Sequence, residues 1–128
     1  MIPSNRPVSA MKKRFLLALP TSGHGGMEDR VSDVLGKAPT FTFVEVVDGV
    51  VRDVRVEENE ASNLSHGAGP IAMKKLKEEG VDAVATVDAG PGAKTLLELS
   101  GIRMIHVVPQ SRVSEATEKA LMQLLTKC

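Results

Sequence analysis

Ala68-Gly69-Pro70-Ile71-Ala72 recurs further along the chain as Ala89-Gly90-Pro91-Gly92-Ala93, and at the same spacing Gly80-Val81 recurs as Gly101-Ile102. Proline suits the first turn of a helix, because the N–H group that it lacks would have no helical partner there. Glycine suits the position just after a helix, because it adopts the left-handed conformation easily. Each copy therefore predicts a helix that starts at Gly-Pro and stops at glycine, followed by a short apolar strand.

Two successive helix–strand units predict parallel strands joined by right-handed crossovers. Upstream of them, Asp48-Gly49 separates two runs rich in β-branched residues, which is a strong signal for a β-hairpin. With an apolar run near the N-terminus, this gives strands at residues 14–19, 41–47, 50–56, 81–87 and 102–108. The simplest arrangement is a three-layer α/β fold, with a mixed five-stranded sheet in the order 3-2-1-4-5 and helices on both faces. That arrangement is the ribonuclease H-like topology, in which only the second strand runs against the others.

The remaining segments give weaker signals. We expect a short helix at residues 27–35 that stops at Gly36, and a final helix that begins near Ser114 as its N-cap. Residues 57–65 are polar and predict a solvated connection, although their acids could instead bind a metal ion. Residues 1–10 predict a disordered extension, and residues 11–128 predict a single domain.

Composition narrows the classes of function. The 128 residues carry 16 acidic and 16 basic side chains, so no positive excess points to nucleic acid or to an anionic membrane. Aromatic residues make up only 2% of the chain, which argues against a platform for stacking bases. Cys128 is the single cysteine, which excludes an internal disulfide and a cysteine-based zinc site. We therefore expect a cytoplasmic protein that binds neither nucleic acid nor a membrane.

Polar and glycine-rich loops meet at one edge of the predicted sheet. The carboxyl ends of strands 1, 3, 4 and 5 share that edge with the N-termini of both repeat helices, and ligands of open α/β folds usually bind there. The candidate binding residues are Thr21, Ser22, Gly23, His24, His66, Gly67, Ala68, Gly69, Ala89 and Gly90. Asp88, Pro109 and Gln110 fall on the same edge.

The predicted edge suits a small anion. Two helix N-termini present free N–H groups and positive dipole ends, which favour phosphate, a carboxylate or an anionic metal–sulfur cluster. The imidazoles of His66 and His24 could add direct bonds to a metal. The alternative for each histidine is an exposed loop residue that binds no ligand. His106 lies inside an apolar run and is expected to be a hydrogen-bonded core histidine.

Several enzyme classes lack the residues that they need. The sequence contains neither a Gly-x-x-x-x-Gly-Lys-Ser/Thr loop nor a Gly-x-Ser-x-Gly elbow. The first strand contains no acid, whereas a nuclease of the ribonuclease H type needs clustered carboxylates there to hold its metal ions. The sequence pattern does not assign a Ser-His-acid triad. We therefore expect a binding protein and not an enzyme.

Several short motifs together resemble one known family. The most specific is Ser65-His66-Gly67-Ala68-Gly69-Pro70, supported by Ala89-Gly90-Pro91-Gly92-Ala93. The other motifs are Leu19-Pro20-Thr21-Ser22-Gly23, Val31-Ser32, Gly36-Lys37-Ala38-Pro39 and Glu58-Asn59. With these, residues 11–125 resemble the dinitrogenase iron–molybdenum cofactor biosynthesis proteins of the NifX/NifB/NafY type.

This resemblance implies a ribonuclease H-like fold that binds or carries an iron–sulfur or iron–molybdenum cofactor precursor, without catalysis and with cofactor-assembly proteins as partners. One motif departs from the family: Ser32-Asp33-Val34-Leu35-Gly36 stands where the family often has Ser-Pro-His-Phe-Gly. One potential metal ligand is therefore absent at Val34, and His24 is the candidate to replace it. The alternative function is a binding module for a small organic anion or phosphate, which uses the same edge without metal.

Overall fold

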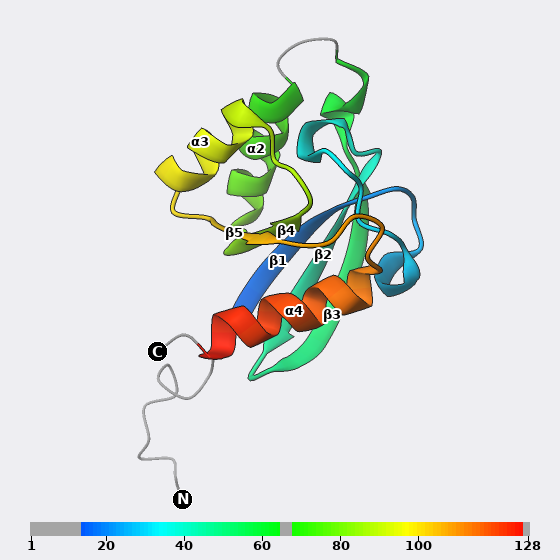
Figure 1. Ribbon diagram of the computed structural model, residues 1–128, viewed down its shortest axis with the longest axis vertical. Helices are drawn as coiled ribbons and strands as arrows, with labels where there is room; N and C mark the ends of the chain where they lie inside the picture. Colours follow the sequence, from blue (N-terminus) through cyan, green and yellow to red (C-terminus); the bar gives the residue numbers. More distant parts are fainter. Residues whose placement is uncertain (1–13, 65–67, 127–128) are drawn as a thin grey trace, which may run out of the picture.

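The computed structural model describes residues 14–64 and 68–126, and a five-stranded sheet runs through its centre (Figure 1). The strands are β1 (Arg14–Thr21), β2 (Thr40–Val47), β3 (Val50–Glu58), β4 (Ala83–Thr86) and β5 (Arg103–His106). Their order in the sheet is β3-β2-β1-β4-β5, and only β2 runs against the others. The predicted mixed sheet and its strand order are therefore confirmed. The extension predicted at residues 1–10 lies outside the described residues.

Helices cover both faces of the sheet. They are α2 (Ala68–Glu79), α3 (Pro91–Leu99) and α4 (Val113–Thr126), with short 3₁₀ turns η1 (Gly26–Glu28), η2 (Leu35–Lys37) and η3 (Glu60–Asn63). Helices α2 and α3 pack on one face and α4 packs on the other (Figure 1). Because successive side chains of a strand point to opposite faces, β1 sends Leu16 and Ala18 into one core and Leu17 and Leu19 into the other.

Local sequence signals explain most of the element boundaries. Asp48 and Gly49 both have positive φ, 53° and 83°, as the predicted tight hairpin requires. Gly80 and Gly101 have φ of 76° and 73° just after α2 and α3, which confirms both predicted helix stops. Pro91 occupies the first turn of α3, where no helical N–H is needed.

The predicted helix at residues 27–35 is wrong. The segment contains η1, then an extended stretch in which Val31 pairs with Thr21 and Arg30 pairs with Arg112. The Asp29 carboxylate accepts hydrogen bonds from the backbone N–H groups of Gly25 and Arg30. These bonds stabilise a turn and compete with the hydrogen bonds that a helix would make through the same backbone. Apolar periodicity could not reveal that competition.

Two smaller predictions also need correction. The connection predicted at residues 57–65 is shorter, because β3 continues through Glu58 and η3 follows. Helix α4 begins at Val113 rather than after an N-cap at Ser114, and the Glu115 carboxylate accepts a hydrogen bond from the backbone N–H of Arg112.

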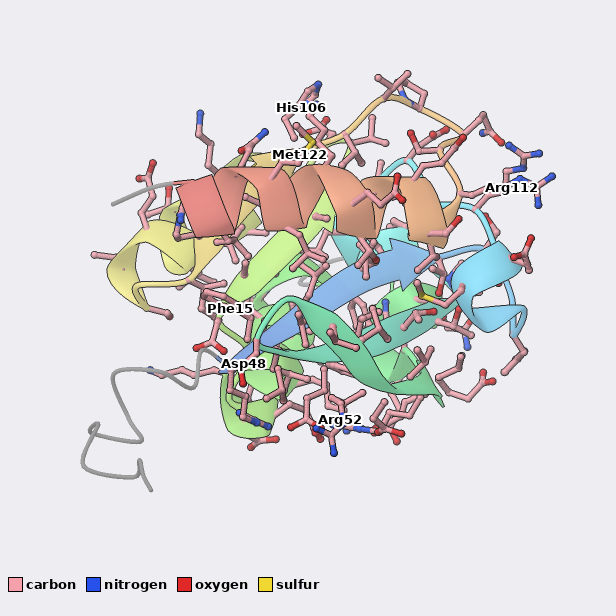
Figure 2. The ribbon with its side chains drawn as sticks, turned by 90° about the horizontal axis from the view of Figure 1, so that it is seen from below. Phe15, Asp48, Arg52, His106, Arg112 and Met122 are labelled. Carbon is pink, nitrogen blue, oxygen red and sulfur yellow. The ribbon has the colours of Figure 1, made fainter. Side chains whose placement is uncertain are left out.

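The prediction that His106 is a core residue is also wrong, because the residue is exposed (Figure 2). β5 is an edge strand. Its side chains alternate between the two faces of the sheet, so Ile105 is buried on one face while Met104 and His106 lie on the other. Met104 is partly covered there and His106 is not.

Candidate functional site

The N-termini of α2 and α3 lie side by side at the carboxyl edge of the sheet, as the repeated motif predicts. A β-carbon built on Gly69 in the first turn of α2 would lie 3.6 Å from the β-carbon of Ala93 in the first turn of α3. Side chains larger than these would force the two helix ends apart. Both helix N-termini therefore lie close together, and the positive end of a helix dipole favours negative charge.

A backbone segment covers the first turn of α2. Gly36 in η2 approaches so closely that a β-carbon there would lie 2.9 Å from the backbone nitrogen of Gly69. The buried side chain of Asn59 fixes this segment, because its Nδ2 donates to the carbonyl oxygens of Gly36 at 3.2 Å and Ala38 at 2.8 Å. Its Oδ1 accepts from the backbone N–H of Ala61 at 3.1 Å. Asn59 thereby joins η2, η3 and the end of β3.

The N-terminus of α3 is more open. Gly90 has φ 82° and ψ 158°, a backbone conformation that is close to glycine-only. The Asp88 carboxylate holds this turn by accepting from the Gly90 N–H at 2.9 Å. Gly92 is exposed, and a β-carbon there would meet nothing within 4 Å. The side chain of Ala89 is buried, so this residue can offer only its backbone to a ligand.

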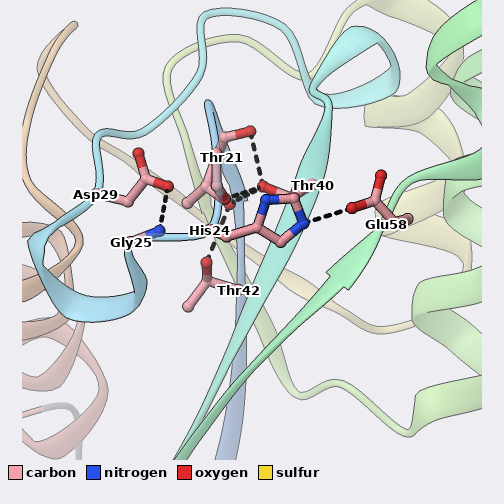
Figure 3. Close-up of polar contacts among 8 residues, drawn as sticks. Thr21, His24, Gly25, Asp29, Thr40, Thr42 and Glu58 are labelled. Atoms are coloured by element: carbon pink, nitrogen blue, oxygen red, sulfur yellow. Dashed lines mark hydrogen bonds and ion pairs between the residues drawn. The ribbon is translucent and has the colours of Figure 1, made fainter.

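The candidate residues after β1 have two different environments (Figure 3). The Thr21 side chain is fully buried, and its hydroxyl lies 2.6 Å from the Thr40 hydroxyl and 3.0 Å from the Thr42 hydroxyl. Thr40 also donates to the Gly23 carbonyl oxygen at 2.6 Å, which fixes the start of the loop. Ser22 is exposed, and its backbone N–H donates to the Arg30 carbonyl at 3.1 Å. Thr21 therefore shapes the loop and offers no free hydroxyl.

The contact of His24 is on the β3 side of the sheet. Its Nε2 hydrogen-bonds Oε2 of Glu58, the last residue of β3, and both side chains are well exposed, at 65% and 70% (Figure 3). The predicted site residues His66 and Gly67 include the second candidate imidazole, and they lie outside the described residues. The structure thus places Gly69 beside Ala93, and His24 beside Glu58.

The sequence did not predict an acidic groove of about 360 Å³ between the end of β3, η3 and α2. Its lining residues are Glu57, Glu58, Asn59, Glu60, Ala61, Ile71, Lys75 and Glu78. Four of them are carboxylates and one is a cation, so the groove favours positive rather than negative ligands. The run of acids at residues 57–60 was its only sequence signal, and the contribution of α2 could not be read from it.

Ion pairs beside the groove tie α2 to β3. Lys75 binds Glu57 at 2.6 Å and Glu79 at 2.9 Å, and Arg55 binds Glu79 at 2.5 Å and also contacts Glu57. The Arg55 guanidinium lies 4.4 Å from the centre of the buried Phe43 ring. Hydrogen bonds from Lys75 and then Arg55 hold the pKa of Glu79 below its ordinary value of 4.5.

Within residues 14–64 and 68–126, no three His, Cys, Asp or Glu side chains gather closely enough to hold a metal ion. In the same part of the chain, no helix has the length and apolar character needed to cross a membrane.

Residues 14–123 match a protein family described as dinitrogenase iron-molybdenum cofactor. The chain belongs to this family. It is 29% identical over 90 residues to an uncharacterized protein of Methanocaldococcus jannaschii, a match that covers 70% of this chain and 72% of that protein. Among solved structures, it is similar to the apo form of the orange protein from Desulfovibrio gigas, with 28% identity and a TM-score of 0.75 over 84% of this chain and 88% of that one.

A second similar structure is that of a Thermotoga protein described as a candidate NifB protein. It shares 26% identity with this chain at a TM-score of 0.67, over 81% of this chain and 84% of that one. Membership of the dinitrogenase iron-molybdenum cofactor family therefore accords with the mixed sheet and with the helices on both of its faces.

Proposed function

We propose that this protein binds and carries an anionic metal–sulfur precursor, of the iron–sulfur or iron–molybdenum type, at the paired N-termini of α2 and α3. The observation that carries the proposal is the contact of Gly69 with Ala93, which places two helix N-termini together in a chain of the dinitrogenase iron-molybdenum cofactor family. The similar orange protein was described in an apo form, a term for a protein that also takes a bound group. We propose a ribonuclease H-like fold acting in the cytoplasm as a carrier and not as an enzyme, with cofactor-assembly proteins as partners.

Backbone groups supply the first part of the binding energy. The proposed binding backbone is the turn at Ala89 and Gly90 and the first turn of α2 at Ala68 and Gly69. The Ser22–Gly23 loop follows the neighbouring strand β1. Each helix dipole is worth only about 0.3–1 kcal/mol at an exposed terminus. Micromolar affinity needs about 8 kcal/mol, so further N–H contacts and a metal–imidazole bond have to supply the rest.

His66 is the proposed principal metal ligand, because it directly precedes the Gly67-Ala68-Gly69-Pro70 stretch that leads into α2. His24 is the proposed second ligand with a smaller contribution, since its imidazole contacts Glu58 on the β3 side. Neutral imidazole is a common ligand of iron and of other transition metals.

The proposal is tested by anaerobic reconstitution of untagged protein with iron, sulfide and molybdate, followed by removal of free metal and metal analysis. His66→Ala is expected to weaken retention at least tenfold, about 1.4 kcal/mol, while the thermal melt changes by less than about 1 kcal/mol. His106→Ala is the matched control, because His106 is an exposed histidine on β5. Loss of binding in the control to the same degree would contradict a specific site.

The same experiment distinguishes the proposed function from the alternative, a metal-free module that binds a small anion. A wild-type protein that retains no metal–sulfur species, but binds phosphate or a small carboxylate with matching shifts at Gly92 and Ala93, would favour the metal-free anion module. Wild-type protein that binds neither kind of ligand would reject both functions at this edge.

A further inference from the structure

We propose that Asp88 determines which anions the paired helix N-termini accept, because its carboxylate repels small free oxyanions at the start of α3. The inference rests on the proposed function and deepens it, since it concerns the class of ligand that the same site takes. Its basis is the hydrogen bond that Oδ1 of Asp88 accepts at 2.9 Å from the backbone N–H of Gly90, the N-cap of α3.

The fold holds the Asp88 carboxylate at the helix start. The backbone of Asp88 is fixed by η2 and the residue before it, because its carbonyl oxygen accepts from the N–H of Leu35 at 3.1 Å and Val34 pairs with Asp88 in an isolated β-bridge. Its side chain is fixed by the bond to Gly90, whose φ of 82° sets the direction of that N–H group. The negative charge of Asp88 is therefore a built feature of this turn.

The carboxylate occupies only part of the helix start. Gly90 has no side chain to cap α3, and the first helical hydrogen bond runs from the Lys94 N–H to the Gly90 carbonyl oxygen at 3.0 Å. The N–H groups of Gly92 and Ala93 lie inside this first turn, where helix geometry gives them no partner within the helix. A ligand can therefore bond these groups, but only beside a negative charge.

The size of the repulsion follows from the short distance along the chain. The backbone nitrogens of Gly90 and Gly92 are two residues apart, so they are separated by at most about 7 Å. Two unit charges at about that separation in water change a binding constant roughly threefold. None of the ion pairs formed within residues 14–64 and 68–126 includes Asp88. The carboxylate should therefore weaken binding of a monoanion roughly threefold and of a dianion roughly ninefold.

This repulsion distinguishes two classes of ligand. Sulfate and phosphate carry their charge on a few atoms, which have to lie at the N–H groups themselves. A larger metal–sulfur cluster spreads its charge over more atoms, which on average lie farther from the carboxylate and are repelled less. Asp88 therefore selects against free oxyanions and leaves the site to ligands that bonds to a metal also hold.

The test is titration of ¹⁵N-labelled wild type and Asp88→Asn with sulfate and with formate, without metal and at constant low ionic strength. Asparagine keeps an oxygen that can accept from Gly90 and removes the charge. From the amide shifts of Gly92 and Ala93, Asp88→Asn is expected to bind sulfate roughly ninefold and formate roughly threefold more tightly than the wild type.

Asp82→Asn is the matched control. Asp82 is exposed, and its carboxylate also accepts from a backbone N–H, that of Leu16 at 2.8 Å, but it lies just before β4 whereas Asp88 follows this strand. The control should change sulfate binding less than twofold, and thermal melts of both variants check the fold. A gain in the control equal to that in Asp88→Asn would overturn the assignment to Asp88.

Ionic strength gives a second readout that a structural role would not change. Raising it from about 0.01 M to about 0.15 M shortens the Debye length from about 30 Å to about 8 Å, so the gain for sulfate should fall to about threefold or less. A gain that persists unchanged, or equal binding by the wild type and Asp88→Asn, would overturn the inference, as would the absence of shifts at Gly92 and Ala93 in both proteins. Failure of the proposed function is detected separately, by reconstitution of the wild type with iron, sulfide and molybdate.

Discussion

The two copies of the Ala-Gly-Pro pattern begin their helices at different residues and in opposite surroundings. Gly69 and Pro70 lie inside the first turn of α2, which begins at Ala68, whereas Gly90 is the N-cap of α3 and Pro91 its first residue. At α2, backbone covers the first turn, and a β-carbon on Gly36 would come within 2.9 Å of the Gly69 nitrogen. At α3, β-carbons on Gly90 and Gly92 would meet nothing within 4 Å. The local motif therefore predicts that a helix begins nearby, whereas a distant segment determines whether that beginning is a packing contact or an exposed surface.

The contrast continues along the two helices. Helix α2 is tied to β3 by the ion pairs of Lys75 and Glu79 with Glu57 and Arg55. Helix α3 ends in Leu99, whose side chain is 79% exposed. The difference suggests that α2 is the fixed support and that α3 presents the accessible backbone.

The largest expected effect comes from Gly36→Ala. The new methyl group would press on the backbone of Ala68 and Gly69, which cannot move aside as a flexible side chain could. We expect a loss of about 2–3 kcal/mol, the usual range for overpacking, and a lower midpoint of chemical denaturation. A variant as stable as the wild type would show that the first turn of α2 is not tightly covered.

Gly90→Ala is expected to have the next largest effect. Alanine has to adopt φ near 82° with ψ near 158°, which costs of order 1–3 kcal/mol, although no atom lies in its way. Because the cost is in the backbone, Gly90→Asn should destabilise the protein less than Gly90→Val, as measured by urea denaturation. The reverse order would indicate that the loss of stability comes from packing, as at Gly36, and not from the backbone conformation.

Gly92→Ala is expected to raise stability and to weaken binding. The residue is exposed in the first turn of α3, where alanine reduces the freedom of the unfolded chain and adds about 0.4–1 kcal/mol. The same methyl group stands between a ligand and the backbone N–H groups. A higher melting temperature together with at least threefold weaker retention of the reconstituted precursor is the expected result. Unchanged retention would mean that the ligand does not approach this backbone.

The smallest expected effect is the pH dependence of the ion pairs that hold α2 against β3. The pKa of Glu79 is lowered by Lys75 and Arg55, so the ionised side chain stabilises the folded state above the unfolded value of 4.5. This contribution is lost as the pH falls through the lower folded pKa. Glu79→Gln should therefore be less stable than the wild type at pH 7 by under about 1 kcal/mol. Denaturation curves measured down to pH 3 should show that gap closing below pH 4.5, and a gap that widens on acidification would contradict the sign.

The sheet could be predicted because its signals are local. The Asp48-Gly49 turn and the glycines that end α2 and α3 act through their own backbone angles. The covering of α2 by Gly36 could not be predicted, because it depends on contact between segments far apart in the chain. His106 was misplaced although its strand was predicted at the edge of the sheet, since an apolar run does not show which side chains of that strand the helices cover.

The candidate site was predictable only in part. The repeated motif located the neighbouring ends of α2 and α3 correctly. The partner of His24 is Glu58, which became its neighbour through the β2–β3 pairing. The acidic groove likewise needs α2 packed beside β3, so the acids at residues 57–60 alone predicted a solvated connection.

Locating the bound precursor by amide NMR tests the central claim most directly. Protein labelled with ¹⁵N is reconstituted anaerobically with iron, sulfide and molybdate, passed through a desalting column to remove free metal, and compared with the untreated protein. The account predicts that the amide signals of Gly69, Gly92 and Ala93 shift or broaden before those of the rest of the described chain. Changes centred on the acidic groove or on α4, with Gly92 and Ala93 unmoved, would contradict it.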